Sequence, residues 1–167
     1  MRVNLSYGRH GLKVTVPDGA DVLQPRYVPG LPDEAWALAE ALRTPIDSPP
    51  LVDLVSPGDT VVIVHTDITR ATPNERILPV VLEEIEGVGV APDDIILLNG
   101  LGTHRRQTDA ELRAMLGADI VDRYRCLQHD CNDDSNLVDM GTTSLGHPVR
   151  INRDYCRADV KILTGFI

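Results

Sequence analysis

Four short segments, most of them apolar, are each followed directly by a polar turn, and they constrain the fold of this chain more than any other feature. They span 61–64, 95–98, 124–128 and 160–163, and the Val, Ile and Leu that dominate them favour β-strands. Amphipathic segments of helical length follow the first two. Strands that alternate with helices indicate parallel βαβ units with right-handed crossovers. The sequence therefore predicts a Rossmann-like, three-layer α/β domain with a mainly parallel sheet.

Shorter elements complete the pattern, and some carry recognisable end signals. Thr72 precedes Pro73 and is expected to cap a helix over 74–86, because proline favours the first helical position. Thr108 and Glu111 have the spacing of a capping box, which predicts the start of another core helix. The other expected elements are an N-terminal hairpin over 2–7 and 11–16, an irregular stretch over 17–32, a helix that opens at 32–34 and runs to Arg43 with Trp36 on its apolar face, a C-terminal hairpin over 137–143 and 148–151, and a short helix over 152–157.

Length and charge limit the classes of protein to which the chain can belong. At 167 residues the chain is expected to form a single domain over 1–167. A net charge of -9 argues against a nucleic-acid partner, which usually selects a basic face. No apolar run approaches the ~20 residues of a membrane span, and the N-terminus lacks the apolar stretch of a signal peptide. We therefore expect no membrane partner and a cytoplasmic location.

The three cysteines do not indicate a disulfide framework or a metal site. Cys126 and Cys131 lie near His129, but this spacing matches neither a pair of Cys-x-x-Cys motifs nor a His-x-x-x-His site. We interpret all three, including Cys156, as buried or incidental thiols. No metal ligand is predicted in this chain.

Polar side chains suited to chemistry crowd the turns after the first two strands. Asp67, Thr69 and Arg70 follow the first strand, and Thr103 and His104 follow the second. The carboxyl ends of parallel strands meet at one edge of a sheet, and open α/β sheets bind ligands there. The sequence therefore predicts one shared site, with the threonine that follows the last strand, Thr164, along the same edge.

Each of these residues has a functional and a purely structural interpretation. The imidazole of His104 suits proton transfer to and from a hydroxyl, although loop histidines are also often solvated. The planar fork of Arg70 suits a carboxylate, although it could also be a solvated loop side chain. Thr69 and Thr103 could bind a phosphate at helix N-termini, or could simply form local turns. Asp67 has no obvious structural task once the helix cap is assigned elsewhere, which favours a functional role.

Two further features of the strand ends receive structural interpretations. His129-Asp130 follows the third strand and could orient the site, but a structural role is favoured because histidines are common in loops. Gly100 and Gly102 are predicted to allow a tight turn, because their spacing is not a full dinucleotide-binding fingerprint.

The order of short motifs along the chain resembles the N-terminal domain of the nickel-dependent lactate racemase family (LarA-like proteins). Asp67-Ile68-Thr69-Arg70 is similar to the family's Asp-x-Thr-Arg, and Gly102-Thr103-His104-Arg105 to its Gly-Thr-His-Arg. The other matching motifs are Tyr7-Gly8 with Gly11-Leu12, Pro57-Gly58-Asp59, His129-Asp130, Gly141-Thr142-Thr143, Asn152-Arg153, Ala158-Asp159 and Thr164-Gly165-Phe166-Ile167.

The resemblance implies a racemase or epimerase of small 2-hydroxy acids. Such enzymes use a nickel pincer nucleotide, which takes a hydride from the substrate's α-carbon to give a 2-keto acid and returns it to either face. Two histidines move the hydroxyl proton. The resemblance assigns one of these roles to His104 and substrate binding to Arg70 and Asp67. We expect Thr69, Gly102 and Thr103, near the expected helix N-termini, to contact the phosphate-bearing cofactor.

The resemblance also places part of the expected machinery outside this sequence. The second histidine, the cofactor-tethering lysine and a metal-binding histidine are expected to follow Ile167, so 1–167 is expected to be a fragment of a two-domain protein that is inactive and cofactor-free alone. Leu101 and Arg106 depart from the family's usual residues, which puts lactate itself in question as the substrate. The alternative function is a non-catalytic, Rossmann-like module that binds a nucleotide or a carboxylate.

Overall fold

The computed structural model describes residues 1–165 and divides the chain into two compact units, Met1–Gly30 and Leu31–Ile167. The sequence predicts one domain over 1–167. In the first unit, β1 (Arg2–Leu5) and β2 (Leu12–Thr15) form the predicted antiparallel hairpin, and the stretch that follows has no regular element. None of its residues is buried, so the hydrophobic core lies entirely in the second unit.

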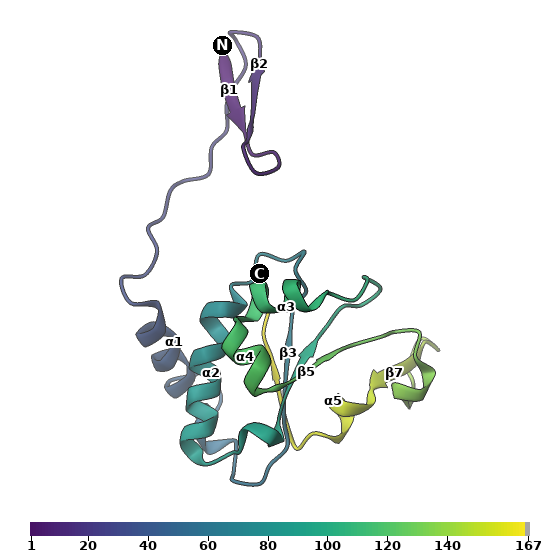
Figure 1. Ribbon diagram of the computed structural model, residues 1–167. Coiled ribbons are helices and arrows are strands. Elements are labelled where there is room, and N and C mark those ends of the chain that lie inside the picture. Colours follow the sequence, from purple (N-terminus) through teal and green to yellow (C-terminus); the bar gives the residue numbers. More distant parts are fainter. Residues whose placement is uncertain (166–167) are drawn as a thin grey trace. The chain divides into compact units, whose positions relative to one another are not determined.

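The second unit contains the predicted alternation of strands and helices (Figure 1). The core strands and helices match the expected ranges to within one or two residues at most ends. Its elements are α1 (Glu34–Arg43), β3 (Val61–His65), α2 (Asn74–Val88), β4 (Ile95–Asn99), α3 (Asp109–Leu116), α4 (Ala118–Arg123), β5 (Arg125–Gln128), β6 (Leu137–Thr142), β7 (Pro148–Asn152), α5 (Arg153–Arg157) and β8 (Val160–Leu163), with 3-10 turns at Leu51–Asp53, Pro92–Asp94 and Asp134–Asn136.

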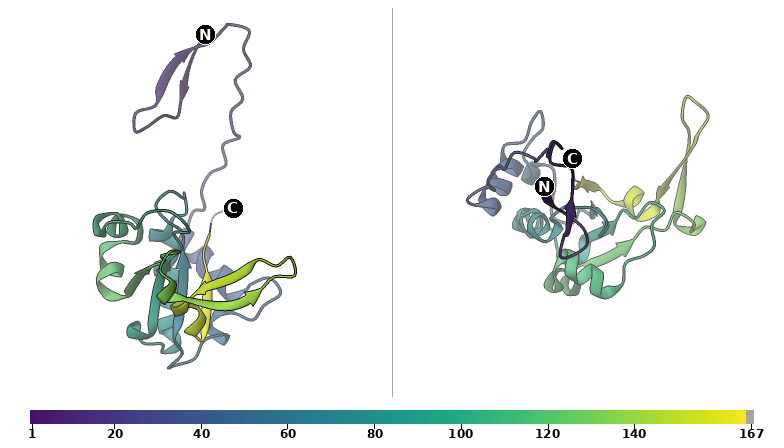
Figure 2. Two further views of the ribbon diagram at one scale, coloured as in Figure 1. Left: turned by 90° about the vertical axis from the view of Figure 1, so that its right-hand side faces the viewer. Right: turned by 90° about the horizontal axis from the view of Figure 1, so that it is seen from above.

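A four-stranded parallel sheet in the order β5-β4-β3-β8 forms the centre of this unit. Along the chain, β4 pairs with one side of β3 and β5 pairs with the outer side of β4. The last strand, β8, pairs with the opposite side of β3. The strand order therefore reverses next to β3, and open α/β sheets bind ligands outside the strand ends at such a point. β6 and β7 form a separate antiparallel hairpin, which projects away from the sheet in Figure 2.

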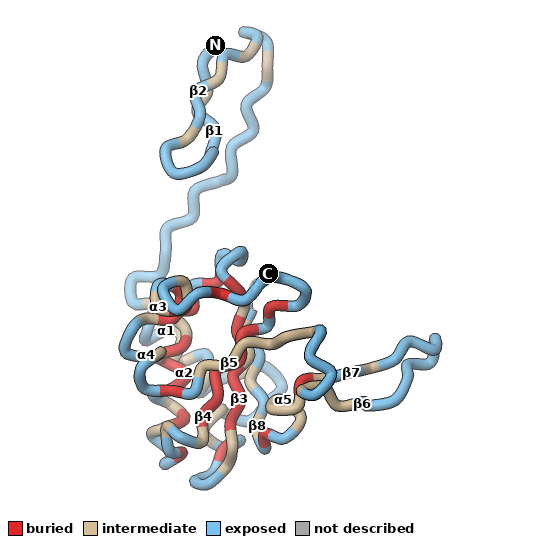
Figure 3. Tube along the Cα trace, turned by 45° about the vertical axis from the view of Figure 1, so that its right-hand side comes forward, coloured by how far each residue is buried: buried red, intermediate tan, exposed pale blue. Residues whose placement is uncertain are grey.

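Side chains that alternate along the strands divide the core into two layers. Ile63 and Leu97 face α1 to α4, whereas Val62 and Leu98 face the short helix α5 on the other side of the sheet. The strongest burial follows β3 and β4 (Figure 3). Fully burying one such side chain contributes about 1.5–3 kcal/mol. These two strands therefore give the most rigid support for whatever follows their carboxyl ends.

The ends of the helices confirm some sequence signals and correct others. Asp33 caps α1, and Thr108 and Glu111 form the predicted capping box of α3. The prediction that Thr72 caps α2 is wrong, because Pro73 occupies the cap position without a side-chain cap and the Thr72 hydroxyl is buried. Trp36 is 63% exposed, so it does not belong to the apolar face of α1 as expected.

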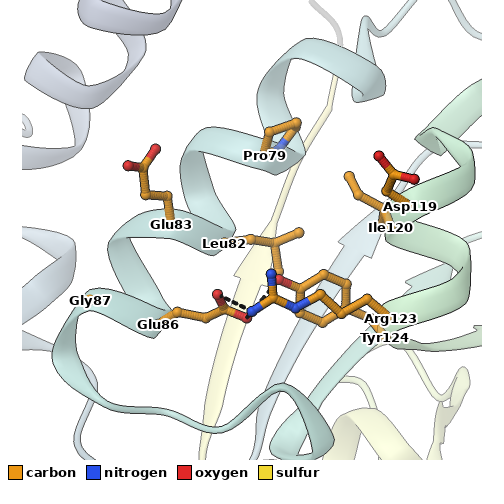
Figure 4. A pocket seen from close by; sticks show the side chains of 9 residues that line it. All are labelled: Pro79, Leu82, Glu83, Glu86, Gly87, Asp119, Ile120, Arg123 and Tyr124. Carbon is orange, nitrogen blue, oxygen red and sulfur yellow. Dashed lines mark hydrogen bonds and ion pairs between the residues drawn. The ribbon is translucent and has the colours of Figure 1, made fainter.

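A hollow of the second unit lies between α2 and α4, away from the strand ends (Figure 4). It has a volume of about 520 Å³. Across it, Arg123 donates to both oxygens of Glu86 at 2.8 and 2.7 Å, and the Tyr124 hydroxyl donates to the same carboxylate at 2.7 Å. Burial and the adjacent carboxylate raise the pKa of Tyr124 to about 12. These contacts join the two helices.

Candidate active site

Two loops at the carboxyl edge of the sheet carry the predicted site residues. The first runs from β3 to α2 and the second from β4 to α3. Gly100 is the first residue of the second loop and lies close to β3. A Cβ atom at this position would lie only 3.3 Å from Val64 Cγ1, so a larger residue would crowd that strand. Gly102 has a φ of +59°, a conformation that favours glycine. The loop therefore depends on both glycines.

Most of the predicted residues line one hollow of about 250 Å³ between these loops. Its walls are formed by Thr66, Asp67, Arg70, Gly100, Leu101, Gly102, Thr103 and His104. The structure thus brings together the proposed acid/base histidine, the proposed carboxylate-binding arginine and the aspartate. Thr69 and Thr164 do not line this hollow.

Asp67 and His104 form a direct pair across the two loops. The Asp67 side chain is 4% exposed, that of His104 is 45% exposed, and His104 Nδ1 contacts Asp67 Oδ2. A carboxylate can only accept, so Nδ1 carries the proton and Nε2 is left as the acceptor of the neutral ring. Burial alone would raise the pKa of Asp67. Hydrogen bonds from Thr69 and His104 outweigh this effect, so the pKa of Asp67 is lowered. The pair therefore combines an ionised carboxylate with an oriented imidazole.

Asp67 also has a structural task that the sequence did not reveal. Its Oδ1 accepts from the Thr69 amide at 2.9 Å and from the Thr69 hydroxyl at 2.6 Å. Both polar groups of Thr69 are thus engaged within the turn, as in the local-turn interpretation. The expected position at a helix N-terminus is wrong for both threonines, because α2 begins at Asn74 and α3 at Asp109. Thr103 is exposed on the second loop and faces the hollow.

The Arg70 guanidinium is the cation of this hollow. It is exposed, and its side chain forms no ion pair or hydrogen bond with any residue in 1–165. Its backbone is fixed, because the Arg70 amide donates to the Asp67 carbonyl at 3.1 Å. By contrast, Arg105 on the other loop is paired with both oxygens of Glu111, at 2.8 and 2.7 Å. Arg70 is therefore positioned to receive an anion.

A second hollow of about 350 Å³ adjoins the first at His104. It shares Gly102, Thr103 and His104 with the first, and Arg106, His129 and Asp130 contribute to its walls. His129 Nδ1 lies 3.4 Å from the side-chain nitrogen of Asn152, which caps α5. This contact joins His129 to the start of α5, as a structural role would require.

Sequence reasoning missed a polar layer at the strand ends, which consists of the buried residues His65, Asn74, Asn99 and Gln107 and the half-buried Gln128. His65, Asn99 and Gln128 are the last residues of β3, β4 and β5, and they are aligned by strand register. A polar residue at the same final position of three core strands is the signal that could have identified it. Burial lowers the pKa of His65, against the effect of its contact with the Thr66 carbonyl, so His65 is a neutral member of this layer.

Among residues 1–165, no three His, Cys, Asp or Glu side chains are grouped so that they could hold a metal ion. The three cysteines are unpaired and half-buried, and burial raises the pKa of Cys126. No helix in this part of the chain is long and apolar enough to cross a membrane.

Comparison with known proteins identifies the family. The family described as the lactate racemase N-terminal domain matches residues 7–167, which is nearly the whole chain. This chain belongs to that family. It is 29% identical over 170 residues to a lactate racemase of Thermoanaerobacterium thermosaccharolyticum, with 99% of this chain and 39% of the relative covered. It is 35% identical over 135 residues to a lactate racemase of Lactiplantibacillus plantarum, with 80% and 31% covered.

Solved structures agree with this membership in the lactate racemase N-terminal domain family. The lactate racemase apoprotein of Thermoanaerobacterium thermosaccharolyticum superposes with a TM-score of 0.80 at 28% identity, over 99% of this chain and 39% of that chain. A Thermotoga maritima protein shares the fold, with a TM-score of 0.58 at 20% identity over 78% of this chain and 32% of its own. The chain therefore spans less than two fifths of the length of these relatives.

Proposed function

We propose that the full-length protein racemises or epimerises a small 2-hydroxy acid, and that this chain supplies one acid/base group and the grip on the substrate carboxylate. The observation that carries the proposal is the Asp67–His104 pair beside the Arg70 guanidinium in one hollow. A 2-hydroxy acid presents a carboxylate and a hydroxyl on neighbouring carbons, and this hollow offers a cation and a base. The relatives named lactate racemase make lactate the first substrate to test.

His104 is proposed to move the hydroxyl proton. With Nδ1 held by Asp67, its Nε2 accepts the proton of the substrate hydroxyl as the α-carbon loses a hydride, which leaves a 2-keto acid. The imidazolium that forms is stabilised by the ionised Asp67 carboxylate. Nε2 then returns the proton when the hydride returns to carbon.

Arg70 is proposed to bind the substrate carboxylate through two parallel hydrogen bonds from its guanidinium. Asp67 lines the same hollow, but its carboxylate is engaged by Thr69 and His104. We therefore propose that Asp67 acts on the substrate through His104 rather than by direct contact. The acid/base group for the opposite face of the substrate is proposed to come from the rest of the protein.

The cofactor proposed for the full-length enzyme is a nickel pincer nucleotide. When bound, this group supplies the acceptor and donor of the hydride. In this chain, Gly102 and Thr103 fit contacts to its polar groups, because they present a loop backbone and an exposed hydroxyl to the hollow. Thr69 fits less well, because its hydroxyl already donates to Asp67. No three potential metal ligands are grouped together in 1–165, so we propose that the rest of the protein holds the metal.

Steady-state kinetics of the cofactor-loaded, full-length protein test the proposal. We expect His104→Ala to lower kcat by about 10²–10⁴-fold, the usual contribution of a positioned acid/base group. The matched control is His147→Ala, which removes an exposed histidine in the β6–β7 turn and should leave kcat unchanged. Near wild-type turnover in His104→Ala would remove the acid/base assignment. If lactate and related acids bind but none is turned over, the non-catalytic binding module becomes the better description.

Arg70→Ala separates substrate binding from proton transfer. We expect it mainly to raise KM, because the proposed grip acts on the carboxylate in the ground and transition states alike. Arg70→Lys should not restore KM fully, since a point charge cannot bind the carboxylate through two parallel hydrogen bonds. Arg157→Ala, which removes an exposed arginine at the end of α5, is the matched control. An unchanged KM in Arg70→Ala would contradict the assigned role.

A further inference from the structure

Gln107 joins the two loops that carry the Asp67–His104 pair. Its side-chain oxygen accepts from the Ile68 amide at 3.1 Å, and its side-chain nitrogen donates to the Arg105 carbonyl at 3.3 Å. Ile68 directly follows Asp67, and Arg105 directly follows His104. One amide side chain thus spans the backbone neighbours of both members of the pair.

The sheet fixes Gln107 in place. Its side-chain oxygen also accepts from the Asn99 side chain at 3.2 Å, which ties it to the end of β4. Its backbone amide donates to Gln128 Oε1 at 2.7 Å, and Gln128 Nε2 donates back to its carbonyl at 3.0 Å. Gln128 ends β5. Gln107 is 6% exposed, so these contacts are shielded from water.

The chemistry of these contacts calls for an uncharged amide. The Ile68 amide and the Asn99 side chain need an acceptor, and the Arg105 carbonyl needs a donor, so one side chain must supply both. A buried amide that loses its acceptor carries a desolvation penalty, and the loop can avoid it only by moving. We infer that Gln107 is the positioning residue of the Asp67–His104 pair, holding the two loops at the separation at which the carboxylate and the imidazole meet.

This inference rests on the proposed function for its kinetic consequence. Misplacement of a catalytic group by about 1 Å can lower a rate by about 10²-fold. In the full-length, cofactor-loaded protein, we expect Gln107→Met, which keeps the length of the side chain and removes its polar atoms, to lower kcat by about 10- to 100-fold. KM should change less than kcat, because Gln107 does not contact Arg70 and acts on its loop only through the Ile68 amide. Gln107→Glu keeps the acceptor for the Ile68 amide and should lie between wild type and Gln107→Met.

A double-mutant cycle separates positioning from a general loss of stability. Gln107→Met should have less than about a twofold effect on kcat in a His104→Ala background, since the group that it positions is then missing. Tyr124→Phe, which removes a partly buried hydrogen bond between α4 and α2, is the control for destabilisation. It should lower the melting temperature without lowering kcat. Equal losses from Gln107→Met in both backgrounds would overturn the inference.

Hydrogen exchange provides a readout that does not depend on activity. In the full-length protein, the amides of 66–70 should exchange faster in Gln107→Met and at the wild-type rate in Tyr124→Phe. Unchanged exchange over 66–70 in Gln107→Met would overturn the positioning role, even if the protein proves to be a racemase. If wild type turns over no 2-hydroxy acid, the proposed function fails. Faster exchange over 66–70 would then still support Gln107 as the residue that joins the loops.

Discussion

At the scale of single residues, Asp67 has two tasks that a substitution can separate. One oxygen closes the turn through Thr69, and the other holds the ring of His104. Asparagine can still accept from the Thr69 amide, but it brings no negative charge to His104. If the full-length protein has the proposed activity, we expect Asp67→Asn to melt within a few degrees of wild type while kcat falls by about 10²–10⁴-fold, the range of a positioned acid/base group.

Asp67→Ala provides the matched comparison in the same assays. It removes the acceptor of both Thr69 groups as well as the partner of His104, so it should lower the melting temperature more than Asp67→Asn does. The two variants should nevertheless have similar kcat values. A full wild-type kcat in Asp67→Asn would show that His104 does not depend on the carboxylate.

At the scale of elements, α3 holds the second loop through its capping residue. Glu111 accepts from the Thr108 amide at 2.8 Å and pairs with both terminal nitrogens of Arg105, which lowers its pKa to about 2. A carboxyl group whose pKa is lower in the folded state stabilises the fold above its unfolded pKa of about 4.3, and this contribution is lost as the pH falls towards the folded value. At pH 7 we expect wild type to have a higher melting temperature than Glu111→Gln. The difference between the two melting temperatures should shrink as the pH falls from about 4.5 to 2.

Melting curves at a series of pH values check this prediction. Asp93→Asn, which neutralises an exposed acid in the 3-10 turn before β4, is the control for a change of net charge. A difference between wild type and Glu111→Gln that stays constant from pH 7 to pH 2 would show that the Arg105–Glu111 pair does not stabilise the fold through its charge.

The elements that the sequence predicted best are those whose signals are local. Apolar runs located β3 and β4, and the pair Thr108 and Glu111 located the start of α3, because strand burial and helix capping depend on neighbouring residues. The cap of α2 was missed because Thr72 is buried, its hydroxyl has no partner among the described residues, and Pro73 takes the cap position. The local pattern of residues does not reveal burial of this kind.

The same distinction applies to the candidate site. Shared position at strand ends predicted that Asp67, Arg70 and His104 would meet, and they line one hollow. The role of Gln107 could not be predicted, because its five hydrogen bonds depend on the register of β4 against β5 and on the path of two loops. Glutamine also carries no charge that would mark it in the sequence.

At the scale of the whole molecule, the chemistry proposed for the family member needs more than this chain. The relatives named lactate racemase are longer, and this chain spans 39% and 31% of the two with which it aligns. Residues 1–165 place one histidine and one free arginine at the hollow, but group no three potential metal ligands. Tight sites for transition metals combine several N, O or S ligands in a defined geometry. A protein made of residues 1–167 alone should therefore lack both nickel and racemase activity.

The metal content of residues 1–167 tests this expectation directly. The purified protein is incubated with nickel, treated with a mild chelator, desalted and analysed for metal, and the full-length protein is treated in parallel as the comparison. We expect far less than one nickel per chain in residues 1–167, together with no interconversion of L- and D-lactate. Stoichiometric nickel that survives the chelator would show that this chain holds a complete metal site. The N-terminal domain would then supply both His104 and the metal ligands, and the proposal that the rest of the protein holds the metal would be wrong.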